Sequence, residues 1–96
     1  MATVVFREFE WDEAKAATNE TKHQVRFEEA TTVFADRGGV YLADAEHQDR
    51  IVVIGMSDQT RVLTVVTAEP GERTRIISAR RATSAERRIY EEEQEP

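Results

Sequence analysis

Hydrophobic and charged residues alternate near the N-terminus, where Phe9 and Trp11 are each preceded by a glutamate. Successive side chains of a β-strand point to opposite faces, so this alternation predicts a half-buried strand over residues 4–11. Asp12 follows directly, and an aspartate carboxylate in this position can accept hydrogen bonds from the free backbone N–H groups of a helix start. We therefore expect a first helix from Asp12 to about Lys22.

A second apolar pattern has the spacing of a helix rather than a strand. Four residues recur at positions i, i+3, i+4 and i+7 and would share one helical face: Phe27, Ala30, Thr31 and Phe34. The pattern predicts a short second helix. Residues 23–25 would then form a tight corner between the two helices.

β-Branched residues dominate the chain after Gly38 and Gly39, which interrupt the helical pattern. Such runs are typical of strands. Four further strands are predicted, and they would form a meander: residues 40–42, 51–54, 62–67 and 74–78.

The sequence Glu69-Pro70-Gly71-Glu72 predicts the turn between the last two strands. Proline presets the first central dihedral angle, and glycine accepts the positive φ that a type II turn requires at the second. If the two glutamates of this turn pair, the register places two pairs of residues opposite each other: Val65 with Ile76, and Val66 with Arg75.

Thr83 and Glu86 have the spacing of a capping box, in which each side chain satisfies a backbone donor near the other residue. They predict a last helix that ends at about Glu92. The predicted order is β-α-α-β-β-β-β-α, an α+β fold with two N-terminal helices, a mainly antiparallel sheet of four to five strands and one C-terminal helix. We expect one domain over residues 1–96.

Composition limits how this fold can be stabilised. The chain has 96 residues, of which 40% are hydrophobic, enough for one modest core. It contains no cysteine, so neither disulfides nor thiolate metal sites contribute. The longest apolar run, residues 51–54, is far shorter than the ~20 residues that span a bilayer. With no signal pattern at the N-terminus, we expect a cytoplasmic protein.

Charge is distributed unevenly along the chain. The 13 Lys and Arg residues against 19 Asp and Glu residues give a net charge of −6. Between residues 73 and 88, however, six arginines accompany one acid, Glu86. An acidic protein repels polyanions unless its positive groups are gathered in one place, so this cluster is either an anion site or a solvated, arginine-rich helix start.

The familiar catalytic motifs are missing from the sequence, which has no glycine-rich phosphate loop and no His/Cys cluster. We therefore expect neither a metal site nor a cofactor. What remains is a set of positive groups at the predicted end of the first helix and around the last strand: Lys22, His23, Arg75, Arg80 and Arg81. Arginine suits phosphate because its planar fork makes two charge-assisted hydrogen bonds.

Each of these candidates also has a structural interpretation. Arg80 could pair with an acid such as Glu86, and His23 could simply cap the first helix, where the helix dipole favours its charged form. Trp11 and Tyr90 could stack on a nucleobase, but aromatic residues at such positions are more often part of a core.

Three stretches of the chain together resemble the BrnT toxins of type II toxin–antitoxin systems. They are residues 9–15 with Asn19 and the Lys22-His23 pair, then residues 27–30, and finally residues 75–83 with residues 86–88 and Tyr90. The resemblance implies a RelE-like fold and a ribonuclease that acts without the ribosome. It also implies a BrnA-like antitoxin with a ribbon-helix-helix domain, which would make the contacts to promoter DNA.

Carried over to this chain, the resemblance assigns catalysis to His23, Arg75 and Arg80. It assigns substrate binding to Lys22, with Arg81 and Tyr90 as supports. The chain departs from the family pattern at four positions: Gln24 stands for the usual glycine, Arg26 for a capping serine, Glu13 for a frequent proline and Thr67 for a frequent aromatic residue.

Two functions from different classes follow. In the first, the chain cleaves RNA without a metal: the 2′-hydroxyl attacks the adjacent phosphate, His23 transfers the proton, and Arg75 and Arg80 stabilise the added negative charge while Lys22 positions the phosphate. In the second, the departures mark a catalytically weakened homologue that serves as an antitoxin-binding co-repressor. A third and weaker hypothesis is an unrelated α+β domain that binds a phosphorylated ligand.

Overall fold

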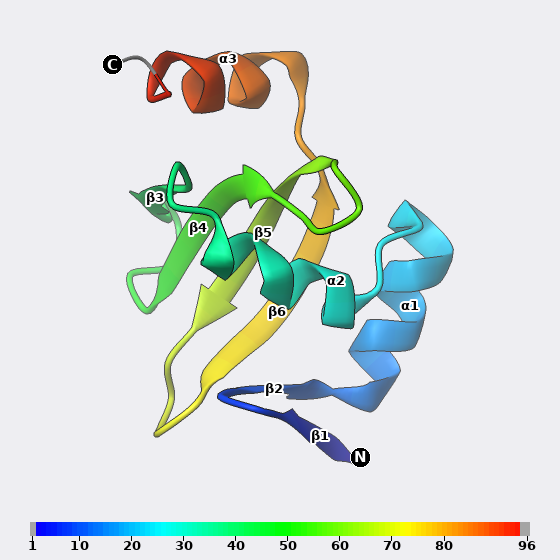
Figure 1. Ribbon diagram of the computed structural model, residues 1–96. Coiled ribbons are helices and arrows are strands. Elements are labelled where there is room, and N and C mark those ends of the chain that lie inside the picture. The colour runs from blue at the N-terminus through cyan, green and yellow to red at the C-terminus, as the bar shows by residue number, and fades with distance from the viewer. Residues whose placement is uncertain (1, 95–96) are drawn as a thin grey trace.

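The computed structural model describes residues 2–94 and shows an α+β fold built on a six-stranded mixed sheet (Figure 1). The strands lie in the order β1-β2-β6-β5-β4-β3, and only the β2–β6 pair is parallel. The strands are β1 (Thr3–Phe6), β2 (Phe9–Asp12), β3 (Val40–Ala43), β4 (Arg50–Met56), β5 (Val62–Ala68) and β6 (Thr74–Arg81). The helices are α1 (Glu13–His23), α2 (Phe27–Thr31), the 3₁₀ helix η1 (Thr32–Ala35) and α3 (Ser84–Glu92).

The predicted α+β class is confirmed, with two helices before the main strands and one after them, but the prediction of four to five strands is wrong. The N-terminal segment forms two strands, because the chain reverses at Arg7 and Glu8 and pairs Phe6 with Phe9. Arg7 takes a left-handed conformation with φ of 59°. Two-residue hairpin turns usually contain glycine or asparagine, and this turn contains neither. The sequence pattern therefore predicted a single strand over residues 4–11.

The predicted starts and ends of the main helices are confirmed. The Asp12 carboxylate accepts a hydrogen bond from the Lys15 backbone N–H at 3.0 Å, and the capping box of Thr83 and Glu86 opens α3. The corner after α1 is formed by Gln24, which has φ of 56° and donates its backbone N–H to the Glu20 carbonyl. α2 is only five residues long, and its N-cap residue, Arg26, makes no side-chain capping hydrogen bond.

The predicted turn and register between β5 and β6 are wrong. No described glycine has a positive φ, so Gly71 does not occupy the second central position of a type II turn. The connection is longer, with Ala68 opposite Arg75, and a bulge in β6 moves Ala79 opposite Val65. Because of the bulge, Ile76 and Ala79 both face the core, although they are three positions apart and would lie on opposite faces of a regular strand.

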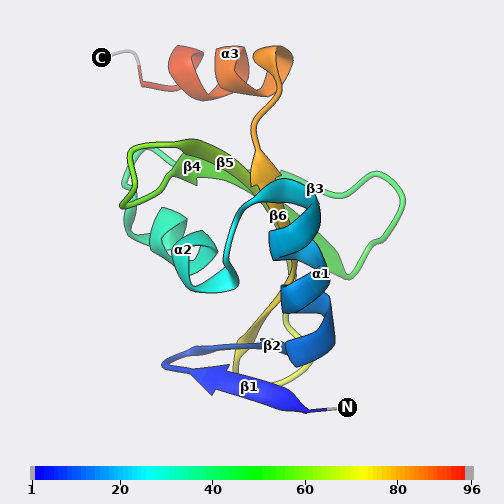
Figure 2. The same ribbon diagram turned by 90° about the vertical axis from the view of Figure 1, so that its right-hand side faces the viewer.

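The helices cover different faces of the sheet. α1, α2 and η1 pack on one face, where the main core lies, and Trp11 contacts Phe27 there edge to face. α3 lies on the other side of β4 and β5 from α2, at the end of the sheet (Figure 2). Among residues 2–94, no helix is long and apolar enough to cross a membrane.

Candidate functional site

An open pocket of about 470 Å³ lies where the end of α1 meets the end of β6. Its lining comes from two segments: Lys22, His23 and Gln24 from the corner after α1, and Arg80, Arg81 and Thr83 from β6 and the link to α3. The pocket thus unites four of the six predicted site residues. No acidic side chain lines it, so its surface is positive on an otherwise acidic molecule.

Asn19 holds the two sides of this pocket together. Its side chain is only 6% exposed; the amide donates to the carbonyls of Ala79 at 2.8 Å and Val25 at 3.0 Å, and the amide oxygen accepts from the Ala79 N–H at 3.1 Å. β2 pairs with β6 only as far as Arg75, so Asn19 satisfies the backbone of β6 where the neighbouring strand no longer reaches.

Sequence reasoning did not identify Asn19 as part of the site. The residue lies one helical turn before Lys22, so its anchorage to Ala79 fixes the end of α1 beside Arg80. One signal was present in the sequence: asparagine is unfavourable inside a helix because its side chain competes for backbone groups. Here the backbone for which it competes belongs to β6.

Two cations of the pocket have no acidic partner. Within residues 2–94, neither Lys22 nor Arg81 lies within ion-pair distance of a carboxylate. Both side chains are exposed, and the half-buried His23 follows Lys22 at the C-terminal end of α1. These positive groups are therefore available to an anion.

Arg80 is already paired. Its Nη1 and Nη2 atoms donate to the two carboxylate oxygens of Glu86 at 2.7 and 2.9 Å. The Thr64 hydroxyl and the Thr83 backbone N–H donate to the same carboxylate, at 2.8 and 2.9 Å. The hydrogen bond from Arg80, with these other donors, lowers the pKa of Glu86 to about 2 against the opposing effect of burial. The ion pair between Arg80 and Glu86, expected if Arg80 has a structural role, is therefore present.

The expected convergence of Arg75 with this pocket is wrong. Arg75 lies near the opposite end of β6, does not line the pocket, and pairs with Glu10 of β2 at 2.5 Å. It lies five positions before Arg80, which corresponds to roughly 17 Å along an extended strand. The two guanidinium groups therefore cannot hold one phosphate, and Arg75 reinforces the short parallel contact between β2 and β6.

Two aromatic candidates are also buried away from the pocket. Tyr90 is 7% exposed and donates its hydroxyl to Asp36 at 2.7 Å, which attaches α3 to the segment after η1. Burial, with this hydrogen bond, raises the pKa of Tyr90 to about 12. Trp11 is 2% exposed. Neither ring presents a face to a nucleobase, so the expected support from Tyr90 and the stacking role of either ring are not supported by their positions.

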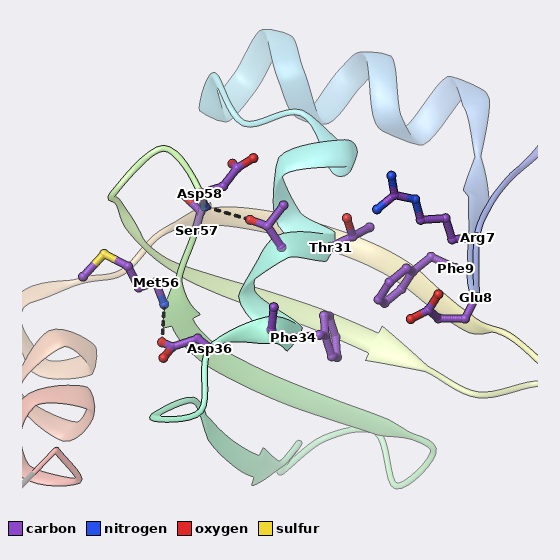
Figure 3. A pocket seen from close by; sticks show the side chains of 11 residues that line it. Arg7, Glu8, Phe9, Thr31, Phe34, Asp36, Met56, Ser57 and Asp58 are labelled. Carbon is purple, nitrogen blue, oxygen red and sulfur yellow. Dashed lines mark hydrogen bonds between the residues drawn. The ribbon is translucent and has the colours of Figure 1, made fainter.

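A larger open pocket of about 640 Å³ lies between the β1–β2 turn and η1 (Figure 3). Arg7 is its single cation, against three acids: Glu8, Asp36 and Asp58. Figure 3 shows Arg7 and Glu8 at one side and Ser57 and Asp58 at the other. This charge balance suits a polyanion less well than the pocket at Lys22 does.

Comparison with known proteins agrees with the resemblance in the sequence. Residues 11–86 match the family model described as the BrnT ribonuclease toxin of type II toxin–antitoxin systems. Among solved structures, the fold is similar to the crystal structure of the Brucella abortus ribonuclease toxin BrnT, with a TM-score of 0.63 and 25% identity over 77% of this chain and 94% of that one. The chain matches none of the curated proteins with which it was compared.

Proposed function

Because this chain belongs to the BrnT family of ribonuclease toxins of type II toxin–antitoxin systems, we propose that it is a cytoplasmic toxin that cleaves free RNA without the ribosome. Residues 1–96 would act as one RelE-like domain, with the pocket between α1 and β6 as its active site. The observation that carries the proposal is a pocket that no acid lines, in which His23 is accompanied by Lys22 and Arg81, two cations with no carboxylate within ion-pair distance among residues 2–94.

The proposed chemistry needs only groups present in this pocket. The substrate 2′-oxygen forms a bond to phosphorus as the bond to the 5′-oxygen breaks. His23 takes the hydroxyl proton and then supplies a proton to the departing 5′-oxygen, the general acid–base role that histidine fills most often in enzymes. Lys22 and Arg81 bind the phosphate and oppose the charge that develops on it.

The geometry redistributes the roles expected from the sequence. Arg81 would take the charge-stabilising role expected of Arg75, because Arg81 lines the pocket and Arg75 does not. Arg80 lines the pocket but shares its guanidinium with Glu86. Tyr90 supports the site only by securing α3.

Membership of a type II toxin–antitoxin family implies an antitoxin partner for this chain. We propose that the partner is a BrnA-like antitoxin with a ribbon-helix-helix domain. In the complex, promoter DNA would be contacted by that domain, because the net charge of −6 on this chain disfavours binding of nucleic acid away from the pocket at Lys22.

One observation favours the alternative, a catalytically weakened homologue that acts as an antitoxin-binding co-repressor. Arg75 and Arg80, the two arginines expected to stabilise the transition state, are both engaged with internal carboxylates. Such a protein would bind the antitoxin tightly, cause no growth arrest and leave RNA intact.

Purified protein and labelled single-stranded RNA test the proposal directly. We expect cleavage, and we expect Lys22→Ala and Arg81→Ala each to lower the rate about 10²-fold or more, as loss of one preorganised donor does. His23→Ala should lower the rate about 10²-fold or more, as loss of a general acid–base group does.

Arg37→Ala is the matched control, since Arg37 is exposed and does not line the pocket. Its rate should equal that of the unchanged protein. Unchanged cleavage by folded Lys22→Ala and Arg81→Ala variants would refute the assignment of the site. The absence of both cleavage and growth arrest, with a stable antitoxin complex, would establish the co-repressor instead.

A further inference from the structure

Arg80 has two kinds of contact: its side chain lines the positive pocket, and it also forms an ion pair with Glu86. A purely structural role would not require the first. The Arg80 side chain is 40% exposed, whereas the Glu86 carboxylate that it holds is 21% exposed. The arginine therefore lines the pocket, and its less exposed partner does not. Glu86 belongs to the first turn of α3, a different element from the strand that carries Arg80.

The contact between them has the form of an anion bound by an arginine fork. Two parallel hydrogen bonds, at 2.7 and 2.9 Å, join Nη1 and Nη2 to the two oxygens of one planar anionic group. A phosphate presents the same pair of charged oxygens to a guanidinium. Glu86 thus occupies the position that a substrate phosphate would take on Arg80.

We propose that Glu86 is an internal competitor for the substrate phosphate: its carboxylate holds Arg80 until an RNA phosphodiester enters the pocket and displaces it. The inference rests on the proposed function and concerns the regulation of the same site. The pocket then has two open cations, Lys22 and Arg81, and a third, Arg80, that becomes available only by exchange of one anion for another.

The attachment of α3 sets how readily the exchange takes place. Thr64 and Thr83 also donate to Glu86, so three groups rather than Arg80 alone hold the carboxylate that the incoming phosphate must displace. Further along, Tyr90 binds Asp36 and the Gln94 amide donates to the Gly38 carbonyl at 2.8 Å, which hold the rest of α3 in place. Exchange therefore requires movement of the Glu86 side chain while α3 stays attached.

Binding of inorganic phosphate tests the inference without relying on RNA cleavage. Phosphate should raise the Tm of Glu86→Gln more than that of the unchanged protein, and its apparent affinity should be about tenfold higher, because a charge-assisted bond to Arg80 is gained without a competing charge. In Arg80→Ala/Glu86→Gln this gain should disappear.

Glu91→Gln is the matched control, because it removes one charge from an exposed position of the same helix. It should leave phosphate affinity within about twofold of the unchanged protein, as expected for screening of an exposed charge. Equal affinities for Glu86→Gln and the unchanged protein, or the same gain in the double variant, would overturn the inference.

The unchanged protein offers a second measurement if Glu86→Gln does not fold. Phosphate or a non-cleavable RNA should shift the Glu86 carboxyl carbon resonance as the carboxylate leaves Arg80, and a resonance that stays fixed at saturation would overturn the proposal. Failure of this test is distinguishable from failure of the proposed function. The proposed function is tested separately, by RNA cleavage in the unchanged protein and its loss in the Lys22→Ala and Arg81→Ala variants.

Discussion

At the scale of single residues, the site depends on a side chain that carries no charge. Asn19 makes three hydrogen bonds, all to backbone groups, and two of them reach a strand 60 residues away in sequence. These hydrogen bonds hold the end of α1 beside β6 at the point where the parallel strand β2 has ended. The positions of Lys22 and His23 relative to β6 follow from that anchorage.

Replacement of Asn19 should therefore be costly. In Asn19→Ala the Ala79 N–H and the carbonyls of Ala79 and Val25 lose their partner, and we expect the free energy of unfolding to fall by about 2–4 kcal/mol. Urea denaturation measures this change. Thr18→Ala, on the exposed side of the same helix, should stay within about 0.5 kcal/mol of the unchanged protein; equal stability of the two variants would refute the role of Asn19.

Most cations of the site could be predicted from the sequence, but not all of their positions relative to one another. The Lys22-His23 corner and the Arg80-Arg81 pair were identified as cations near predicted element ends, and the structure brings them together. Arg75 was grouped with them because it is close to Arg80 in sequence and because the family resemblance assigns it to catalysis. A strand extends by about 3.3 Å per residue, so neighbours in sequence along β6 lie far apart in space.

At the scale of elements, side-chain signals predicted helices better than strand pairing. Caps at Asp12 and Thr83 are local, and both were confirmed. The bulge in β6 and the two-residue turn after β1 depend on contacts with the core and with neighbouring strands. No residue within either segment marks them, so the register and the strand number were predicted wrongly.

The ion pair between Arg80 of β6 and Glu86 of α3 makes the stability of the fold depend on pH. The folded pKa of Glu86, about 2, lies below its ordinary value of 4.5, so the ionised carboxylate stabilises the fold above about pH 4.5 and loses this effect as the pH falls towards 2. The contribution is up to about 3 kcal/mol. Urea denaturation at a series of pH values should show a decline that is shallower in Glu86→Gln.

Other carboxylates also titrate in this range, since hydrogen bonds lower the pKa of Asp36 and Glu29 despite burial. The difference between the unchanged protein and Glu86→Gln isolates the contribution of Glu86. If that difference is constant from pH 6 to pH 2, the ion pair with Arg80 does not stabilise the fold.

At the scale of the whole molecule, one positive pocket on a chain of net charge −6 limits how RNA can bind. Few phosphates are neutralised, so salt should weaken binding only modestly. With Lys22 and Arg81 as the two contacts, a plot of log K against log salt for a non-cleavable single strand should have a slope of about −1.4.

Release of Arg80 in Glu86→Gln would add a third contact and steepen the slope to about −2. Fluorescence anisotropy over a range of potassium concentrations measures both slopes. A slope steeper than about −4 would instead indicate an RNA path that extends well beyond this pocket.

The connection between β5 and β6 lies at the opposite end of β6 from the pocket, and a Cβ added at Gly71 would meet nothing within 4 Å. The chain has no native cysteine, so Gly71→Cys would supply a unique thiol for a fluorescent dye or a surface tether. RNA and antitoxin binding could then be followed at one immobilised molecule whose attachment point leaves the pocket unobstructed.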